Sequence, residues 1–196
     1  MNSLRSDVTA LVLAGGRGSR MGGIDKGWAP YRGVPLITHV LSRLVPQVSA
    51  VLVNANRSVS RYQRLGWPVL HDADPTAFDG PLAGMLAGLR ACETPWLLTA
   101  PCDSPFVPTD YAGRMVSAAE DAGASVAMAS DGDRHQPVFC LLHRDRVHSL
   151  TAYLANGDRK IDLWTRAEGA IEVVFRSETA FRNFNTASEL RDDDTP

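Results

Sequence analysis

The residues with the clearest chemistry form a glycine-rich, basic loop. The sequence LAGGRGSRMGGIDKG (13–27) begins at the end of the apolar run VTALVLA (8–14). Glycine lets the main chain approach a ligand closely, and consecutive N–H groups form a nest for an anion. Arg17, Arg20 and Lys26 add positive charge to the same loop. This combination predicts a binding site for a polyphosphate, with an ordinary glycine-rich turn as the alternative.

The loop does not match two common phosphate-binding patterns. A Walker A loop ends in Gly-Lys-Ser/Thr, whereas Lys26 lies between Asp25 and Gly27. The dinucleotide fingerprint G-x-G-x-x-G, started at Gly16, fails because Met21 stands at its last position. The pattern that remains is L-A-G-G-x-x-x-R-M-G-x-x-K.

A carboxylate after a second apolar segment is the candidate metal ligand. Asp103 follows WLLTAPC (96–102), where a charged group is costly unless it has a partner. Mg²⁺ in proteins typically takes one or two carboxylates together with phosphate oxygens and water. We therefore expect Asp103 to bind Mg²⁺ beside the phosphates. A cap for the helix expected near Pro108 is the alternative for Asp103, and a solvated loop lysine is the alternative for Lys26.

The elements that must position these residues alternate between strands and helices. Nearly continuous apolar runs predict buried strands, and apolar residues at i, i+3 and i+4 predict helices. The expected strands are 8–14, 49–56, 68–72, 96–104, 124–130, 136–144 and 170–176, and the expected helices are 35–47, 60–66, 80–92, 108–123, 146–157, 159–169 and 184–192. This order predicts a single three-layer α/β/α domain over residues 1–196, with a mostly parallel, Rossmann-like sheet. We expect residues 1–6 and 191–196 to be flexible ends.

The ligand site is expected at one edge of this sheet. In open α/β sheets, ligands bind beyond the carboxyl ends of the strands. The segments AGGRGSR, NAN, HD and PCDSP all follow predicted strands. Asn54, within NAN, carries an amide that can both donate to and accept from the edge of a base. A turn-forming role is the alternative for Asn54.

Composition narrows the class of protein. The apolar fraction of 44% is typical of a globular protein, and the formal net charge of −2 gives no overall positive field for nucleic acid. No apolar run approaches the roughly 18 residues of a membrane span, and the start is unlike a signal peptide because Asp7 precedes a short apolar stretch. The cysteines, Cys92, Cys102 and Cys140, form no CxxC pair, which is typical of free thiols. We expect a cytoplasmic protein without a nucleic-acid or membrane partner.

The order of several segments resembles one enzyme family. GIDKG, GVPLITHV, VNANR, DGPLAGMLAGL, PCDSPFVP and FNTASEL follow one another as in the molybdenum cofactor guanylyltransferases, from about Thr9 to Leu190. The glycine loop is shared with other nucleotidyltransferases, whereas VNANR and PCDSP are more discriminating. Two departures are NTAS, where the family tends to have Asn-Thr-Pro, and Trp28, where an aliphatic residue is more usual.

The resemblance implies a reaction and a set of residues. It implies a nucleotide-diphospho-sugar transferase type of fold and the transfer of GMP from GTP to the phosphate of molybdopterin-bound molybdenum cofactor, with release of pyrophosphate by Mg²⁺-assisted in-line attack. No protein nucleophile is needed. The implied catalytic residues are Lys26, Arg20 and Asp103, and the implied nucleotide-binding residues are Leu13, Ala14, Gly15, Gly16, Lys26, Asn54, Asp72 and Asp103.

The pocket for the second substrate is expected opposite the nucleotide. Arg134, in DGDRHQP, and Asn183 and Asn185, in FRNFNTAS, are the candidates to line it. An ordinary surface turn is the alternative for the segment around Arg134.

Several alternatives for the whole chain stay open. The chain could be a cytidylyltransferase for the same pterin, a sugar- or polyol-phosphate nucleotidyltransferase, or a non-catalytic nucleotide-binding accessory protein. For the guanylyltransferase that the resemblance implies, the partners would be GTP and the molybdenum cofactor as substrates, with transient contacts to cofactor-biosynthesis proteins or molybdoenzyme chaperones.

Overall fold

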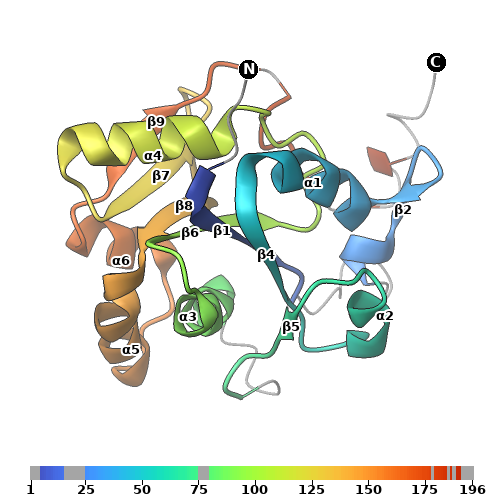
Figure 1. Cartoon of the computed structure of the whole chain (residues 1–196), viewed down its shortest axis with the longest axis horizontal. Coiled ribbons are helices and arrows are strands. Elements are labelled where there is room, and N and C mark those ends of the chain that lie inside the picture. Colours follow the sequence, from blue (N-terminus) through green and yellow to red (C-terminus); the bar gives the residue numbers. More distant parts are fainter. Residues whose placement is uncertain are drawn as a thin grey trace.

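A seven-stranded sheet in the order β5-β4-β1-β6-β8-β7-β9 forms the centre of the computed structural model (Figure 1). The structure describes residues 5–15, 25–74, 80–177, 179–184, 186, 189 and 190 of the 196 in the chain. The strands of this sheet are β1 (Arg5–Leu13), β4 (Val48–Asn54), β5 (Val69–Leu70), β6 (Trp96–Pro101), β7 (Val126–Ser130), β8 (His135–His143) and β9 (Ile171–Val174).

Helices and short elements occupy the connections between the strands. The α-helices are α1 (Leu36–Leu44), α2 (Val59–Gln63), α3 (Pro81–Ala91), α4 (Tyr111–Ala122), α5 (Val147–Ala155) and α6 (Ile161–Ala167). The 3-10 helices are η2 (Lys26–Trp28), η3 (Val45–Gln47) and η4 (Arg144–Arg146), and β2 (Pro30–Tyr31) pairs with β3 (Val34–Pro35) in a separate small sheet. No described helix is long and apolar enough to cross a membrane.

The main sheet is mostly parallel, as the alternation of elements predicts. β1 pairs in parallel with β4 and β6, β4 pairs in parallel with β5, and β7 with β9. β8 is antiparallel to both β6 and β7. The reason is the length of the β7–β8 connection, residues 131–134, because a parallel crossover needs about a dozen residues or more.

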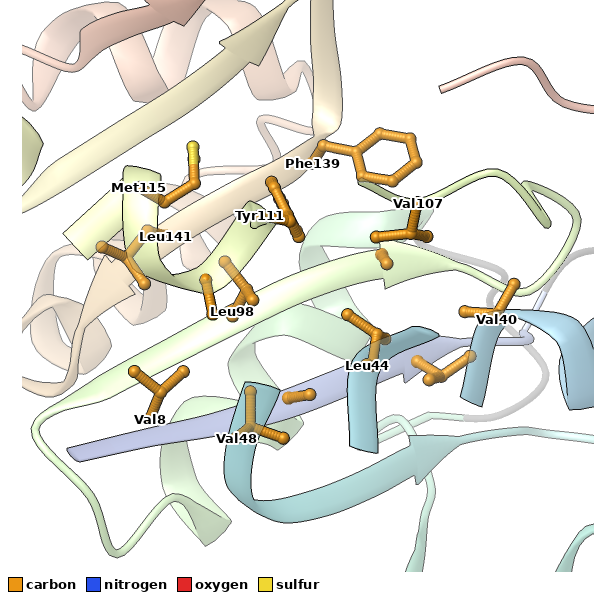
Figure 2. Close-up of a cluster of buried hydrophobic side chains, with 14 of the residues drawn as sticks. Val8, Val40, Leu44, Val48, Leu98, Val107, Tyr111, Met115, Phe139 and Leu141 are labelled. Carbon is orange, nitrogen blue, oxygen red and sulfur yellow. The ribbon is translucent and has the colours of Figure 1, made fainter. Parts of the chain in front are cut away.

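β1 is buried on both faces, which explains its nearly continuous apolar sequence. Val8 and Val12 pack toward α1 and α4, whereas Leu11 and Leu13 pack toward α3. Figure 2 shows the first of these clusters, in which Tyr111 of α4 joins side chains from the strands and from α1. Helices α1 and α4 therefore form one outer layer and α3, α5 and α6 the other (Figure 1), which confirms the three-layer prediction.

Several element boundaries differ from the sequence predictions. β1 begins at Arg5, three residues before the predicted start, and Arg5 pairs with Val48. β5 has only two residues. Among the described residues of the predicted helix 184–192, Glu189 and Leu190 are helical, and the Glu189 N–H donates to Thr186 Oγ1 at 3.2 Å, which is the bond of an N-cap. Phe184 precedes this cap, and its N–H donates to the Asp103 carbonyl at 3.0 Å while its ring packs beside Tyr31.

Helix α3 lies unusually close to the sheet because of its glycines. A Cβ atom built on Gly88 would lie 2.5 Å from Leu11 Cδ2 and 3.0 Å from Leu97 Cδ2. One built on Gly84 would lie 2.5 Å from Asn54 Oδ1 and 2.6 Å from Leu13 Cδ2. The spacing of these glycines thus lets the helix backbone approach β1 and brings it against the end of β4.

A matched pair of glycine substitutions tests this close packing. Gly113→Ala in α4 should stabilise the protein by about 0.5–1 kcal/mol, since a Cβ there meets no atom within 4 Å and alanine favours helix. Gly88→Ala should instead destabilise by about 1–3 kcal/mol, because core leucines must move. Urea unfolding measures both changes. A stabilising Gly88→Ala would contradict the close approach.

Candidate active site

The ends of β1, β4 and β6 lie side by side at the carboxyl edge of the sheet. Leu13 is in register with Asn54 on one side and with Pro101 on the other. Beyond the strands, the Ala14 N–H donates to the Asn54 carbonyl at 2.8 Å, and the Cys102 N–H donates to the Leu13 carbonyl at 3.0 Å. These bonds hold the start of the glycine-rich loop beside the segment that carries the candidate metal ligand.

Lys26 and Asp103 meet at this edge. The Lys26 ammonium donates to Asp103 Oδ2 at 3.0 Å, although the two residues are 77 positions apart in sequence. Their side chains are 25% and 11% exposed, so the pair lies at a partly buried position where charge interacts more strongly than in bulk water. Within the described ranges, no hydrogen bond reaches the other carboxylate oxygen, Asp103 Oδ1. The structure therefore brings together the two residues that were predicted to share a site.

A second polar cluster lies at the ends of β4 and β5. Asp72 accepts from Asn54 Nδ2 at 2.9 Å and from Asn56 Nδ2 at 2.6 Å, and its own N–H donates to Asn56 Oδ1 at 3.0 Å. Asp72 is 8% exposed and Asn54 is 2% exposed. A buried carboxylate with several donors is well compensated for its loss of water.

This cluster changes how Asn54 contributes to the site. Its amide nitrogen is bonded to Asp72, and its Oδ1 would lie 3.2 Å from a Cβ on Gly15. The Asn54 side chain therefore lies between Asp72 and Gly15, and its direct contact with a base stays a prediction. Asn56, which sequence reasoning did not single out, completes the network. Its place in the quoted segment VNANR was the available signal.

The C-terminal segment reaches the same region. The Phe184 N–H donates to the Asp103 carbonyl, and the Phe184 ring lies 5.1 Å from Tyr31 and 6.1 Å from Phe106, centroid to centroid. Asn183 precedes Phe184 and is exposed. The candidate pterin-binding residue Asn183 is thus next to the backbone that supports Asp103.

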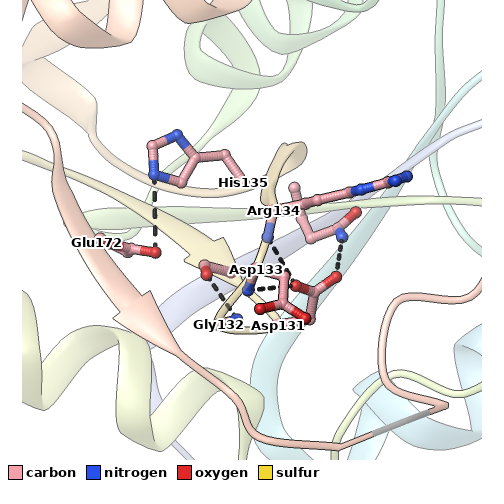
Figure 3. A network of polar contacts seen from close by, with 8 residues as sticks. Asp131, Gly132, Asp133, Arg134, His135 and Glu172 are labelled. Atoms are coloured by element: carbon pink, nitrogen blue, oxygen red, sulfur yellow. Dashed lines mark hydrogen bonds and ion pairs between the residues drawn. The ribbon is translucent and has the colours of Figure 1, made fainter.

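Arg134 lies in the hairpin between β7 and β8 (Figure 3). Because β8 is antiparallel to β6, its first residues are at the edge where β6 ends. The Asp131 carboxylate accepts from the N–H groups of Arg134 and Asp133 and from Gln136 Nε2. These backbone hydrogen bonds lower the pKa of Asp131 and give the hairpin a defined shape, with Arg134 exposed.

Three other predicted site residues lie outside the described residues. They are Gly16, Arg20 and Asn185. Leu13, Ala14 and Gly15 are described: Leu13 ends β1, and the Ala14 N–H donates to the Asn54 carbonyl.

Cys102 is next to Asp103 but is poorly suited to nucleophilic attack. Burial raises the pKa of the Cys102 thiol well above its usual range, and the negative charge of Asp103 raises it further. The reactive form of cysteine is the thiolate, which this environment disfavours. The described cysteines Cys92, Cys102 and Cys140 are all free.

The donor set fits a magnesium ion that the substrate helps to bind. In the part of the chain that the structure describes, no group of three His, Cys, Asp or Glu side chains is arranged to hold a metal. Asp103 lies at this edge with one carboxylate oxygen that no described group bonds. Mg²⁺ commonly uses one or two carboxylates and takes its other ligands from phosphates and water, and Asp103 suits that role.

Comparison with known proteins places the chain among nucleotidyltransferases. A family model described as the MobA-like NTP transferase domain matches residues 10–171. A molybdenum cofactor guanylyltransferase of Ralstonia nicotianae is 54% identical over 195 residues, covering 95% of each chain. One of Cupriavidus necator is 51% identical over 196 residues, covering 97% of this chain and 98% of its own.

A solved structure shares the fold. Molybdopterin-guanine dinucleotide biosynthesis protein A from Archaeoglobus fulgidus superposes with a TM-score of 0.74 at 21% identity, covering 94% of this chain and 95% of that one. At this identity the similarity concerns the fold alone, and it agrees with the α/β/α arrangement described above.

The raised pKa of the Cys102 thiol predicts that the stability of the protein depends on pH. Because the pKa of Cys102 is raised in the folded protein, the unfolded chain loses a proton that the folded protein keeps once the pH passes about 8.5, the ordinary thiol value. Stability is therefore retained below about pH 8.5 and falls above it. When urea unfolding is measured at a series of alkaline pH values, the free energy of unfolding should fall less with pH for Cys102→Ala than for the wild type. Equal slopes would contradict the shifted pKa.

Proposed function

The chain belongs to the MobA-like NTP transferases, and we propose on this premise that it transfers GMP from GTP to the molybdenum cofactor and releases pyrophosphate. The family assignment confirms the resemblance seen in the sequence and makes the chain a nucleotidyltransferase. The observation that carries the proposal is the contact between Lys26 and Asp103 at the carboxyl edge of the sheet.

The nucleotide occupies the carboxyl edge of the sheet in this proposal. The backbone of residues 13–15 and the following glycine-rich loop bind the phosphates and the nucleoside, with Arg20 as an additional cation. Asn54 and Asp72, at the ends of β4 and β5, contribute to the wall for the nucleoside. Their closed hydrogen-bond network supports a rigid wall.

Lys26 and Asp103 have different roles in the reaction. The Lys26 ammonium neutralises negative charge that develops on the phosphates in the transition state. Asp103 holds Mg²⁺ through its carboxylate, and the bound ion would supply charge neutralisation to the leaving pyrophosphate. The 3.0 Å contact between the two side chains supports a shared location for these roles.

The proposed chemistry requires no covalent enzyme intermediate. A phosphate oxygen of the pterin attacks the α-phosphorus of GTP, the new P–O bond forms in line, and the bond to pyrophosphate breaks. The chain's task is to hold two anions in this alignment. The buried, protonated thiol of Cys102 is consistent with this task, since the thiol takes no part.

The pterin substrate is proposed to lie opposite the nucleotide. Asn183 is next to the backbone contact of Phe184 with Asp103, and Arg134 is on the hairpin at the same edge of the sheet. Asn185 is the third proposed contact. We also propose a cytoplasmic location, consistent with free cysteines, and transient contacts with cofactor-biosynthesis proteins or molybdoenzyme chaperones.

The deciding experiment is a nucleotide panel. Pyrophosphate release is measured with GTP, CTP or ATP, each with Mg²⁺ and with or without the molybdenum cofactor. We expect release to require both GTP and the cofactor. A preference for CTP would favour the cytidylyltransferase alternative, and nucleotide binding without turnover would favour an accessory protein.

Removing the carboxylate charge of Asp103 should impair turnover. Asp103→Asn is expected to lower the rate of pyrophosphate release by about 10²–10³-fold, as loss of a key electrostatic group commonly does. The exposed Asp133 provides the matched control, Asp133→Asn, with an unchanged rate. An Asp103→Asn enzyme with wild-type rate would rule out the proposed metal role.

Lys26→Ala should slow the chemical step more than it weakens nucleotide binding. We expect kcat to fall by about 10²-fold, with a smaller change in the Kd for GTP, because the charge acts mainly in the transition state. Lys160 is the only other lysine in the sequence, so Lys160→Ala controls for loss of a lysine. An effect confined to the Kd would contradict the role assigned to Lys26.

A further inference from the structure

We propose that Tyr62, on the short helix α2, is a positioning residue that fixes Lys26 in the active site through Asp25. The inference rests on the proposed function and deepens it. The Tyr62 hydroxyl donates to Asp25 Oδ1 at 2.5 Å. Asp25 directly precedes Lys26 and is the N-cap residue of η2. Tyr62 lies 36 positions beyond Lys26, so the contact joins α2 to the segment that carries the catalytic lysine.

Tyr62 is suited to act as a permanent donor. The residue is fully buried, and burial raises the pKa of its hydroxyl far above the usual range. The hydroxyl therefore stays protonated and can donate to the Asp25 carboxylate at any pH at which the enzyme works. A charge-assisted hydrogen bond of this kind is short and directional.

The residues on both sides of Lys26 contact the same helix. A Cβ built on Gly27 would lie 2.5 Å from the Tyr62 hydroxyl and 3.4 Å from Cys102 Sγ. The Trp28 ring lies 5.1 Å from the Tyr62 ring, centroid to centroid, and the Arg61 guanidinium lies 4.1 Å from the centre of Trp28. The backbone of η2 is therefore pressed against α2.

Cys102 links this packing to the other half of the catalytic pair. It is the residue before Asp103, and its sulfur is among the nearest atoms to Gly27. With Asp25, Gly27 and Trp28 all held, Lys26 extends to Asp103. Tyr62 thus sets the distance between the lysine backbone and the carboxylate without contacting the substrate.

The second carboxylate oxygen of Asp25 is an independent reason to assign a function to the hydrogen bond between Tyr62 and Asp25. This oxygen, Oδ2, is buried, and among described residues it has no hydrogen-bond partner. Such an atom costs stability, and η2 gains no side-chain cap from Asp25 in return. An arrangement that is unfavourable for folding but directed at the catalytic lysine is typical of functional sites.

The consequence for catalysis follows from the flexibility of lysine. A lysine side chain has many rotamers, and only a few place its ammonium on the reacting phosphates. A misplacement of about 1 Å can lower the rate by about 10²-fold. Fixing the backbone at Asp25 and Gly27 restricts the positions that the Lys26 ammonium can adopt, and it leaves the contacts with bound GTP unchanged.

The first test is Tyr62→Phe, which removes only the hydroxyl. We expect kcat to fall by about 10-fold or more, with little change in the KM for GTP. The control is Tyr153→Phe, because the Tyr153 hydroxyl donates to the Lys160 carbonyl far along the chain, and this variant should keep the wild-type kcat. Equal activity of Tyr62→Phe and the wild type would overturn the proposal.

Substitutions of Asp25 give a second route should Tyr62→Phe fold poorly. Asp25→Asn keeps an oxygen that can accept from Tyr62, so it should retain most of the kcat. Asp25→Ala should match Tyr62→Phe. Equal losses in Asp25→Asn and Asp25→Ala would show that the hydrogen bond is not what matters, and would overturn the proposal.

A double-mutant cycle separates positioning from general destabilisation. In the Lys26→Ala background, Tyr62→Phe should cause no further loss of kcat, because there is no ammonium left to position. A merely structural role would lower the rate by the same factor in both backgrounds. That additive result would overturn the inference while leaving the proposed function intact.

A labelling experiment tests the same idea without turnover. Limited acylation of the lysines, read by peptide mass spectrometry, compares Lys26 with Lys160, the only other lysine. Tyr62→Phe should raise the reactivity of Lys26 relative to Lys160 several-fold, since the ammonium is less firmly held against Asp103. An unchanged ratio would overturn the positioning role. An inactive wild type would instead count against the proposed function.

Discussion

The contact between Lys26 and Asp103 is the constraint on which the rest of the site depends. Asp103 follows β6, whose Pro101 is in register with Leu13 at the end of β1, and Lys26 reaches Asp103 from η2. A partly buried ion pair adds little net stability, because desolvation offsets much of the attraction. In the proposed function, phosphates and a metal ion take over the interactions of each charge at this edge of the sheet.

Helix packing and site geometry are coupled in this molecule. Gly84 brings α3 against Asn54 and Leu13. The distance at which α3 packs on the sheet therefore determines where the ends of β1 and β4 lie. On the other side of the edge, Tyr62 of α2 contacts Gly27 and Asp25. This edge of the sheet is thus held between two helices, and its rigidity comes from the packed interior as well as from its own hydrogen bonds.

The two polar clusters at this edge differ in how well their groups are paired. Asp72 has its donors from Asn54 and Asn56, and such a satisfied network favours one arrangement of the backbone. Asp25 and Asp103 each retain an oxygen that no described group bonds. The Asp72 cluster therefore supports the strand ends, whereas in the proposed function the Asp103 oxygen that no described group bonds is available to Mg²⁺.

The sequence by itself determined the layered fold, the parallel core of the sheet and the edge that carries Lys26 and Asp103. Those features follow from apolar periodicity and from loop composition, which are local properties. Only the tertiary structure decided that Asn54 donates to Asp72, that the Phe184 N–H donates to the Asp103 carbonyl, and that Tyr62 contacts Asp25. The physical reason is that a side chain's hydrogen-bond partner depends on residues distant in sequence, which no local pattern encodes.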